Sequence, residues 1–162
     1  MIDVYIGVGS NLGDRRNNCQ SAVRQLKHNG IEVIKVSPVY ETEPWGVKEQ
    51  PPFLNLAIHC RTSLPPEELL RRLKDIEKQL GRESTYHWGP RTIDLDILFY
   101  GDRIVNQKEL VIPHPHIAQR LFVLKPLSDI APFLIHPVLN RTILELLQEF
   151  KDKQAIHQVE GL

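Results

Sequence analysis

The sequence predicts an α+β fold, with a mainly antiparallel sheet, both core helices on one face of it and helical additions at the C-terminal end. Stretches of alternating apolar residues and stretches with apolar residues at helical spacing follow one another in the order β-α-β-β-α-β. Prolines interrupt the last third of the chain, which is typical of loops and short helices. A length of 162 residues fits a single domain spanning 1–162.

The first strand is predicted from Ile2, where apolar residues begin to alternate, into the glycine-rich segment 7–14. Asp14 is the expected N-cap of the helix that follows, and Gly30 is its expected end. Segment 31–39 is rich in β-branched residues, so we predict a second strand there.

Segment 43–52 contains three prolines, and we expect it to form a loop that acts as a lid or binding loop. Apolar residues alternate again over 53–62, which predicts a third strand. Prolines at 65–66 open a second helix that Gly81 ends, and the fourth strand is predicted over 92–100.

Beyond the fourth strand we predict a helix near 118–127 and another after Thr142. The element order up to residue 100 is that of the ferredoxin-like arrangement, in which both helices cover one face of an antiparallel sheet. The C-terminal third then adds to this core.

Composition excludes several classes of protein. The chain has 20 Lys+Arg and 20 Asp+Glu, and this zero net charge argues against a general nucleic-acid binder. No apolar run approaches the ~18 residues of a membrane helix, and the N-terminus does not resemble a signal peptide. Cys19 and Cys60 have apolar neighbours and are expected to be buried free thiols. We therefore expect a cytoplasmic monomer whose partners are small molecules, with neither nucleic acid nor membrane among them.

Asp94 and Asp96 are the sharpest local feature, because the period of a strand places both carboxylates on one face. The opposite face would take the apolar residues Ile93, Leu95, Ile97 and Phe99. The two Cα atoms would lie ~6.6 Å apart, where two carboxylates repel by ~2–3 kcal/mol at an effective dielectric constant of 20. A divalent cation reverses that repulsion, and hard oxygen ligands of this kind suit Mg²⁺. A solvated sheet face is the alternative for this pair taken alone.

Arg82 and Arg91 precede the acidic strand. A guanidinium group matches phosphate oxygens through its planar fork, and a metal-binding acid pair beside arginines is what phosphoryl transfer requires. The alternative is a simple ion pair of Arg91 with Asp94.

Glu77 falls on the apolar stripe of the second predicted helix, so its carboxylate must find a partner or a ligand. It could accept hydrogen bonds from a sugar hydroxyl. It could equally pair with one of the nearby cations Arg71, Lys78 or Arg82.

Other candidate residues give weaker signals. Phe53 and Asn55 share one face of their strand and suit a flat heterocycle, although core packing explains most phenylalanines. His114 is expected to contact phosphate or to be structural, since no zinc spacing surrounds it. The glycines of segment 7–13 favour a tight turn with close backbone approach over a dinucleotide-binding loop. The chain also contains no P-loop.

Segment 88–98, Trp-Gly-Pro-Arg-Thr-Ile-Asp-Leu-Asp-Ile-Leu, closely resembles the signature of the hydroxymethyl-dihydropterin pyrophosphokinase family of folate synthesis. The resemblance extends over nearly the whole chain through the weaker matches at 7–14, 40–46, 53–55, 113–115 and 120–127.

This resemblance implies a single pyrophosphokinase domain that transfers pyrophosphate from ATP to the hydroxymethyl group of 6-hydroxymethyl-7,8-dihydropterin and releases AMP. By matching position, Asp94 and Asp96 would hold two Mg²⁺ ions and act in catalysis together with Arg82 and Arg91. The ATP site would comprise Glu77 on the ribose, Trp88 and Ile97 near the nucleotide, and Arg82, Arg91, His114 and Arg120 on the phosphates. The pterin site would comprise Phe53 and Phe122 on the two ring faces, and Asn55, Thr42, Glu43, Pro44, Trp45 and Asp94 around the edge.

Three positions depart from the family pattern, because Ser84, His87 and Glu109 stand where relatives often carry basic residues. Two other functions remain open at this point. Two-metal phosphodiester hydrolysis also uses an acid pair with arginines, and a non-catalytic ligand-binding module would fit the same scaffold.

Overall fold

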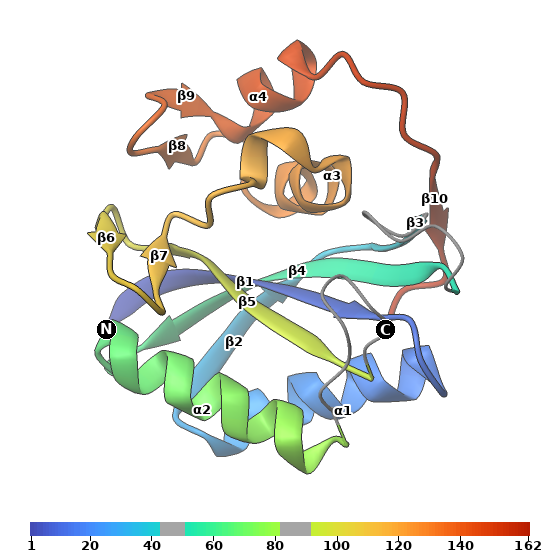
Figure 1. The fold of residues 1–162 in the computed structure, drawn as a ribbon, viewed down its shortest axis with the longest axis vertical. Coiled ribbons are helices and arrows are strands. Elements are labelled where there is room, and N and C mark those ends of the chain that lie inside the picture. Colours follow the sequence, from blue (N-terminus) through green and yellow to red (C-terminus); the bar gives the residue numbers. More distant parts are fainter. Residues whose placement is uncertain (43–50, 82–91) are drawn as a thin grey trace.

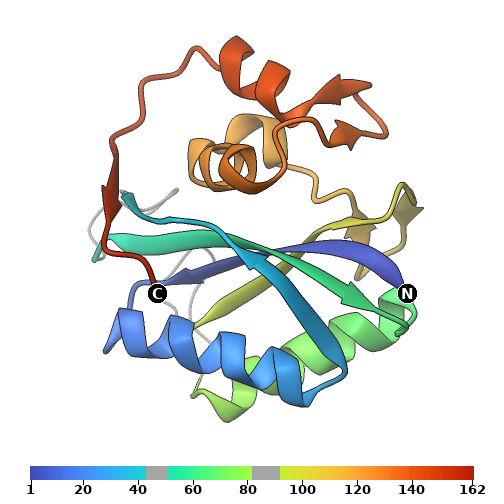
Figure 2. The ribbon, with the colours of Figure 1, turned by 180° about the vertical axis from the view of Figure 1, so that it is seen from behind.

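An antiparallel sheet separates two layers of helix in the computed structural model, which describes residues 1–42, 51–81 and 92–162 (Figure 1). Helices α1 (Arg15–His28) and α2 (Pro66–Gln79) cover one face of the sheet. Helices α3 (Leu121–Ile130) and α4 (Ile143–Glu149) lie on the opposite side (Figures 1 and 2). The predicted mixture of helices and antiparallel strands is therefore confirmed.

Strand β1 (Ile2–Ser10) is central and pairs antiparallel with β4 (Phe53–Thr62) on one side and β5 (Asp94–Tyr100) on the other. The far edge of β4 pairs with two shorter strands, β2 (Ile31–Val36) and β3 (Val39–Thr42). All of these pairings are antiparallel, and they place β5 at one edge of the sheet.

The single strand predicted over 31–39 is wrong, because the chain breaks between β2 and β3. Pro38 has no N–H to donate to a continuous ladder. Ser37 bridges the interruption: its N–H donates to the carbonyl of Ala57 at 2.9 Å, and its hydroxyl accepts the N–H of Ala57 at 2.8 Å. The strand therefore bends without leaving backbone groups of β4 unsatisfied.

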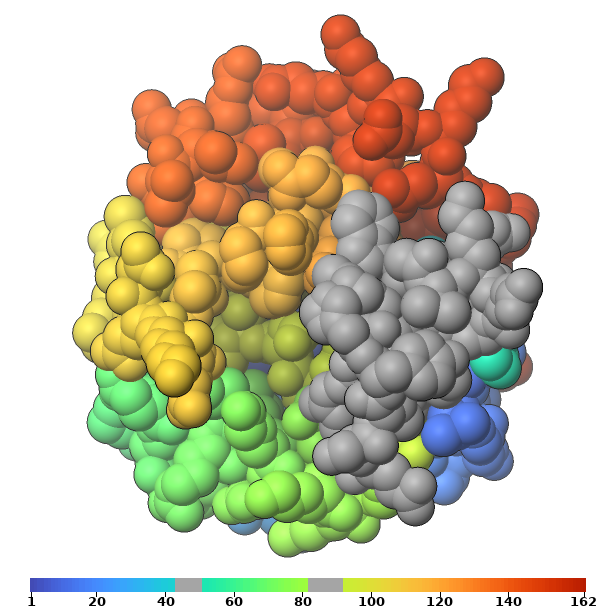
Figure 3. Space-filling view, viewed as in Figure 1, coloured from blue at the N-terminus to red at the C-terminus, as the bar shows by residue number. Residues whose placement is uncertain are grey.

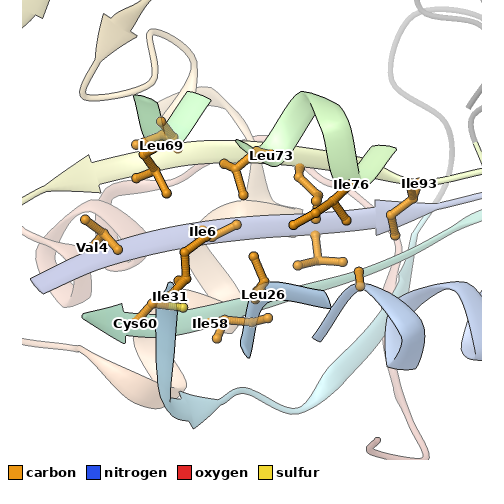
Figure 4. Close-up of a cluster of buried hydrophobic side chains, with 14 of the residues drawn as sticks. Val4, Ile6, Leu26, Ile31, Ile58, Cys60, Leu69, Leu73, Ile76 and Ile93 are labelled. Atoms are coloured by element: carbon orange, nitrogen blue, oxygen red, sulfur yellow. The ribbon is translucent and has the colours of Figure 1, made fainter. Parts of the chain in front are cut away.

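The predicted caps of the core helices are present. The Asp14 side chain accepts a hydrogen bond from the N–H of Asn17 at 3.1 Å and begins α1. Gly81, at a φ of +86° that favours glycine, follows the end of α2. Apolar residues of both helices pack on the alternate residues of β1, β4 and β5, and Figure 4 shows this core. Cys19 and Cys60 are buried within it as free thiols, and burial raises the pKa of each to about 12.

The second layer is built from the C-terminal part of the chain. Leu124, Leu127 and Ile143 pack against Ala57 and Phe99 of the sheet. The helix predicted near 118–127 begins later, at Leu121, after a short 3₁₀ turn at Ile117–Gln119. Small two-stranded ladders join these elements, and they are β6 (Val105–Asn106) with β7 (Val111–Ile112) and β8 (Ile135–His136) with β9 (Arg141–Thr142).

Phe99 does not share a face with Leu95 and Ile97, contrary to the prediction from strand period. The pairing of β1 with β5 shifts between Tyr5 and Ile6, which is a β-bulge. An extra residue in β5 reverses the alternation, so Phe99 packs under α3 and α4 while Ile97 stays on the side of α1 and α2.

The chain returns to the sheet after α4, which no sequence pattern predicted. Strand β10 (Ile156–Val159) pairs antiparallel with β3 and becomes an edge of the sheet (Figure 2). No helix among the described residues is long and apolar enough to span a membrane.

The bridging role of Ser37 predicts that Ser37→Ala lowers the free energy of unfolding by about 1–3 kcal/mol, because the buried N–H of Ala57 loses its acceptor. Chemical denaturation measures this change. Ser63→Ala, at an exposed serine beyond the end of β4, is the matched control and should stay within about 0.5 kcal/mol of the parent. Equal stabilities of the two variants would contradict the role given to Ser37.

Candidate functional site

The face of the sheet opposite α1 and α2 carries the polar residues singled out above. Gly9 of β1 lies directly between Asn55 of β4 and Asp94 of β5, and Gly7 lies next to Asp96. Directly opposed residues of an antiparallel pair share a face. The two aspartates and the asparagine therefore point to the side of the sheet where α3 lies.

Glycine at position 9 makes room for close neighbours. A Cβ atom there would lie 3.1 Å from Asn55 Oδ1 and 3.5 Å from Phe53 Cδ1. The missing side chain keeps the sheet surface open between Asn55 and Asp94. Of the tight turn with close backbone approach predicted for this glycine-rich segment, Gly9 shows the close approach, but it lies within β1 and not in a turn.

Thr42, Phe53 and Asn55 lie together at one end of this face. The Asn55 amide donates to the Thr42 hydroxyl at 2.7 Å, and both side chains are buried. Thr42 is also opposite Phe53 in the pairing of β3 with β4. Because the amide is held by this bond, the Asn55 carbonyl oxygen has a fixed direction next to Gly9.

Arg120 joins the aspartates from the other layer. It is the residue directly before α3 and is 8% exposed. Burial lowers the pKa of Arg120, while the negative charges of Asp96 and Asp94 act in the opposite direction. The Arg120 guanidinium also lies 5.6 Å from the centre of the Phe122 ring. An arginine, an aromatic ring and two carboxylates thus meet where α3 begins.

His114 adds a titratable group beside Arg120. Its backbone N–H donates to the carbonyl of Leu98 at 3.1 Å, which fixes the chain after β7 to β5. Burial, the positive charge of Arg120 and the neighbouring His116 lower the pKa of His114 to about 4. The imidazole is therefore neutral near pH 7 and can donate or accept a hydrogen bond without adding charge.

Glu77 finds a backbone partner. Its carboxylate accepts the N–H of Leu95 at 2.8 Å, and the residue is 5% exposed. Arg71, one of the partners considered for Glu77, pairs instead with Glu68. Because β5 is an edge strand, this bond fastens the strand to α2 between the two aspartates. Ile97 is buried in the same core between β5 and the helices.

Ser10 and Asn11, at the end of β1, were missed by sequence reasoning. The Ser10 hydroxyl donates to the carbonyl of Thr92 at 2.5 Å, and the Asn11 amide donates to the carbonyl of Pro51 at 3.0 Å. Both side chains are almost fully buried. Two small polar residues directly after an apolar strand were the available signal. These two hydrogen bonds fix the backbone at Pro51 and Thr92, which follow segments 43–50 and 82–91 in the chain.

Several predicted site residues lie outside the described residues, and they are Glu43, Pro44, Trp45, Arg82, Trp88 and Arg91, with Ser84 and His87. The residues that flank segment 82–91 are close, because the Thr92 hydroxyl donates to the carbonyl of Gly81 at 3.3 Å. Figure 3 shows a hollow between α2 and the segment leading into α3, with atoms of β5 at its base. Among the described residues, no group of three or more His, Cys, Asp or Glu side chains could hold a metal ion.

Comparison with known proteins places the chain in a class of transferases, the pyrophosphokinases. Residues 5–132 match the family 7,8-dihydro-6-hydroxymethylpterin-pyrophosphokinase (HPPK), and the chain belongs to this family. Relatives of the chain are named pyrophosphokinases too, and the family match confirms the resemblance seen at segment 88–98.

The 2-amino-4-hydroxy-6-hydroxymethyldihydropteridine pyrophosphokinase of Aquifex aeolicus is 42% identical over 156 residues, which cover 96% of this chain and 94% of that protein. The folic acid synthesis protein fol1 of Pneumocystis carinii is 47% identical over 149 residues, but the match covers 92% of this chain and only 20% of that larger protein. A crystal structure of Plasmodium falciparum HPPK-DHPS with pteroate has a similar fold, with a TM-score of 0.74 at 18% identity over 91% of this chain and 42% of that chain. Some relatives therefore contain this fold as one part of a longer protein.

The depressed pKa of His114 predicts a pH-dependent stability. Between pH 6.5 and about 4 an unfolded chain binds a proton on His114 that the folded chain does not. The free energy of unfolding therefore decreases as the pH falls through this window, and the decrease is roughly 3 kcal/mol at most. His114→Gln should remove this loss, whereas the exposed His28→Gln should retain it. Urea unfolding between pH 4.5 and 7.5 measures the difference, and parallel profiles for wild type and His114→Gln would contradict it.

Proposed function

We propose that this chain transfers the pyrophosphoryl group of ATP to the hydroxymethyl oxygen of 6-hydroxymethyl-7,8-dihydropterin and releases AMP. ATP as co-substrate follows from the pyrophosphokinase activity of the family. One observation carries the choice of site. A single sheet face brings residues suited to a flat acceptor next to residues suited to a polyphosphate: Thr42, Phe53 and Asn55 beside Asp94, Asp96 and Arg120.

The chemistry joins the pterin oxygen to the β-phosphorus of ATP and breaks the bond from that phosphorus to the α,β-bridging oxygen. The hydroxymethyl proton leaves to solvent, and AMP leaves with the bridging oxygen. Such transfer needs positioning and charge neutralisation more than covalent help from the protein. The proposed site contains both negatively and positively charged side chains, which can position the substrates and neutralise their charge.

Asp94 and Asp96 supply hard carboxylate oxygens on one face of a strand fastened by Glu77, a donor set that suits Mg²⁺. Two carboxylates leave ligand positions open for phosphate oxygens, and we propose that they hold two ions. Bound Mg²⁺ would neutralise the triphosphate and orient it. Asp94 is also close to the proposed acceptor end of the face, because only Gly9 lies between it and Asn55.

Arg120 and His114 are proposed phosphate ligands. Arg120 brings a buried positive charge to the aspartates, so it can neutralise charge that develops on the transferred group. The neutral imidazole of His114 can donate one hydrogen bond beside it. We propose that Arg82 and Arg91, which begin and end segment 82–91, act as catalytic phosphate ligands with them.

The nucleotide is proposed to lie along the edge where α2 meets β5. Glu77 is already at this edge and would take a ribose hydroxyl, with Ile97 behind it in the core. Trp88 would complete the nucleotide site.

The pterin is proposed to stack between the rings of Phe53 in β4 and Phe122 in α3. The fixed Asn55 amide and Thr42 hydroxyl would hydrogen-bond its edge. Glu43, Pro44 and Trp45 follow Thr42 directly in the chain and would complete this side of the site.

We further propose that residues 1–162 act as one pyrophosphokinase domain and as a monomer. The antiparallel order that runs from β2 and β3 through β4 and β1 to β5 supports a ferredoxin-like core. The buried free thiols of Cys19 and Cys60 support a reducing compartment such as the cytoplasm.

The decisive experiment measures AMP in the presence of ATP, Mg²⁺ and the reduced hydroxymethyl-pterin. AMP should appear in step with pterin diphosphate, should need the pterin, and should disappear with EDTA. ADP as the product would contradict pyrophosphoryl transfer. Phosphate release without the pterin would indicate two-metal hydrolysis, and pterin binding without turnover would indicate a binding module.

Asp96→Asn tests the metal-ligand role. The variant should keep the wild-type melting temperature and lose at least about a hundredfold in kcat, because one charged ligand to the cation is removed. Asp102→Asn, at an exposed aspartate after the same strand, should keep wild-type turnover. Parallel losses of folding and activity in Asp96→Asn would mark a structural carboxylate instead.

A further inference from the structure

Tyr40 is a buried residue that the proposed reaction does not use. It lies in β3 and is 4% exposed. Its hydroxyl donates a hydrogen bond to the carboxylate of Asp129 in α3, and 89 residues separate the two in sequence. The second carboxylate oxygen of Asp129 is 3.5 Å from the Lys125 ammonium group. Burial and the Asp129 carboxylate both raise the pKa of Tyr40, so the phenol stays protonated and remains a donor.

The two residues belong to the elements that carry opposite sides of the proposed pterin site. Tyr40 faces Asn55 in the pairing of β3 with β4, and Thr42 lies two residues farther along β3. Asp129 is in the last turn of α3, and Phe122 is in its first turn. This hydrogen bond therefore joins the strand proposed to hold the pterin edge to the helix proposed to hold one of its ring faces. Figures 1 and 2 show α3 above β4, with β3 at its side.

The other contacts of α3 with the sheet are of two kinds. At its start, Arg120 lies near Asp94 and Asp96 of the edge strand β5. Farther along, Leu124 and Leu127 pack on Ala57, and such apolar contacts set the distance between the layers without fixing direction. Neither contact ties the end of α3 to β3. A hydrogen bond to a carboxylate is directional and strong in a buried setting. It can therefore fix how far α3 is rotated and shifted over β4, and with it the place of the Phe122 ring.

We propose that Tyr40 and Asp129 are positioning residues for the pterin, which set the gap between Phe53 on β4 and Phe122 on α3. The inference rests on the proposed function, since it assigns these residues to the acceptor half of that site. Neither residue is assigned a contact with the substrate; the pair acts through Phe122, Thr42 and Asn55.

The test compares steady-state kinetics for Tyr40→Phe, Asp129→Asn and a matched control. Tyr40→Phe should raise KM for the pterin by roughly tenfold and KM for ATP by less than about threefold. Asp129→Asn keeps an acceptor oxygen, so its KM for the pterin should stay closer to wild type. The control is Tyr100→Phe, because Tyr100 is equally buried, its hydroxyl donates to the Leu64 carbonyl at 2.6 Å, and it lies in the core beneath the other face.

A double-mutant cycle separates positioning from general destabilisation. Tyr40→Phe, Asp129→Ala and their combination should each raise KM for the pterin by about the same tenfold, since all break one bond. A combined effect near a hundredfold would overturn the inference, as would equal pterin KM values for Tyr40→Phe and Tyr100→Phe. If Tyr40→Phe does not fold, Asp129→Ala compared with Asp129→Asn decides by the same criterion. A wild-type enzyme that forms no AMP overturns the proposed function and this inference together, whereas an active wild type with unaffected variants overturns this inference alone.

Discussion

The register of β1 between β4 and β5 is the constraint on which the rest of the site depends. A shift of one residue in either pairing would turn Asn55 or Asp94 and Asp96 into the core between sheet and helices. The apolar partners Val8, Leu56 and Leu95 oppose such a shift, because it would expose them. Packing by α1 and α2 on one face thus determines which side chains are available on the other.

Charges of both signs then share the available face. Asp94 and Asp96 lie on adjacent same-face positions of an edge strand, and the buried Arg120 reaches them from α3. A guanidinium is costly to bury alone, so its place depends on the carboxylates as much as theirs depends on it. The zero net charge of the chain thus coexists with a local site in which opposite charges meet, and we propose that this site takes a metal ion together with phosphate groups.

Sequence patterns predicted the strands and helices whose formation depends on residues close together in the chain. Alternation and caps located β1, β4, α1 and α2, and the period of β5 placed both aspartates on one face. The bulge that reverses Phe99, the break at Ser37 and the added strand β10 depend on partners distant in the chain. The same holds for Glu77, whose carboxylate binds a backbone N–H that no helix pattern could indicate. The roles of Arg82, Arg91 and Trp88 rest on the sequence alone and stay predictions.

Hydrogen bonds between residues distant in sequence fix the relative positions of elements more precisely than apolar packing does. Ser10 and Asn11 donate to the carbonyls of Thr92 and Pro51, so the end of β1 holds two residues that are distant in the chain. Tyr40 and Asp129 join the two layers in the same manner on the acceptor side. Each of these bonds satisfies a buried group that would be costly to leave alone, which links the stability of the fold to the geometry of the site. A substitution at any of them is therefore expected to change substrate affinity before it unfolds the chain, because the apolar cores on both faces of the sheet stay intact.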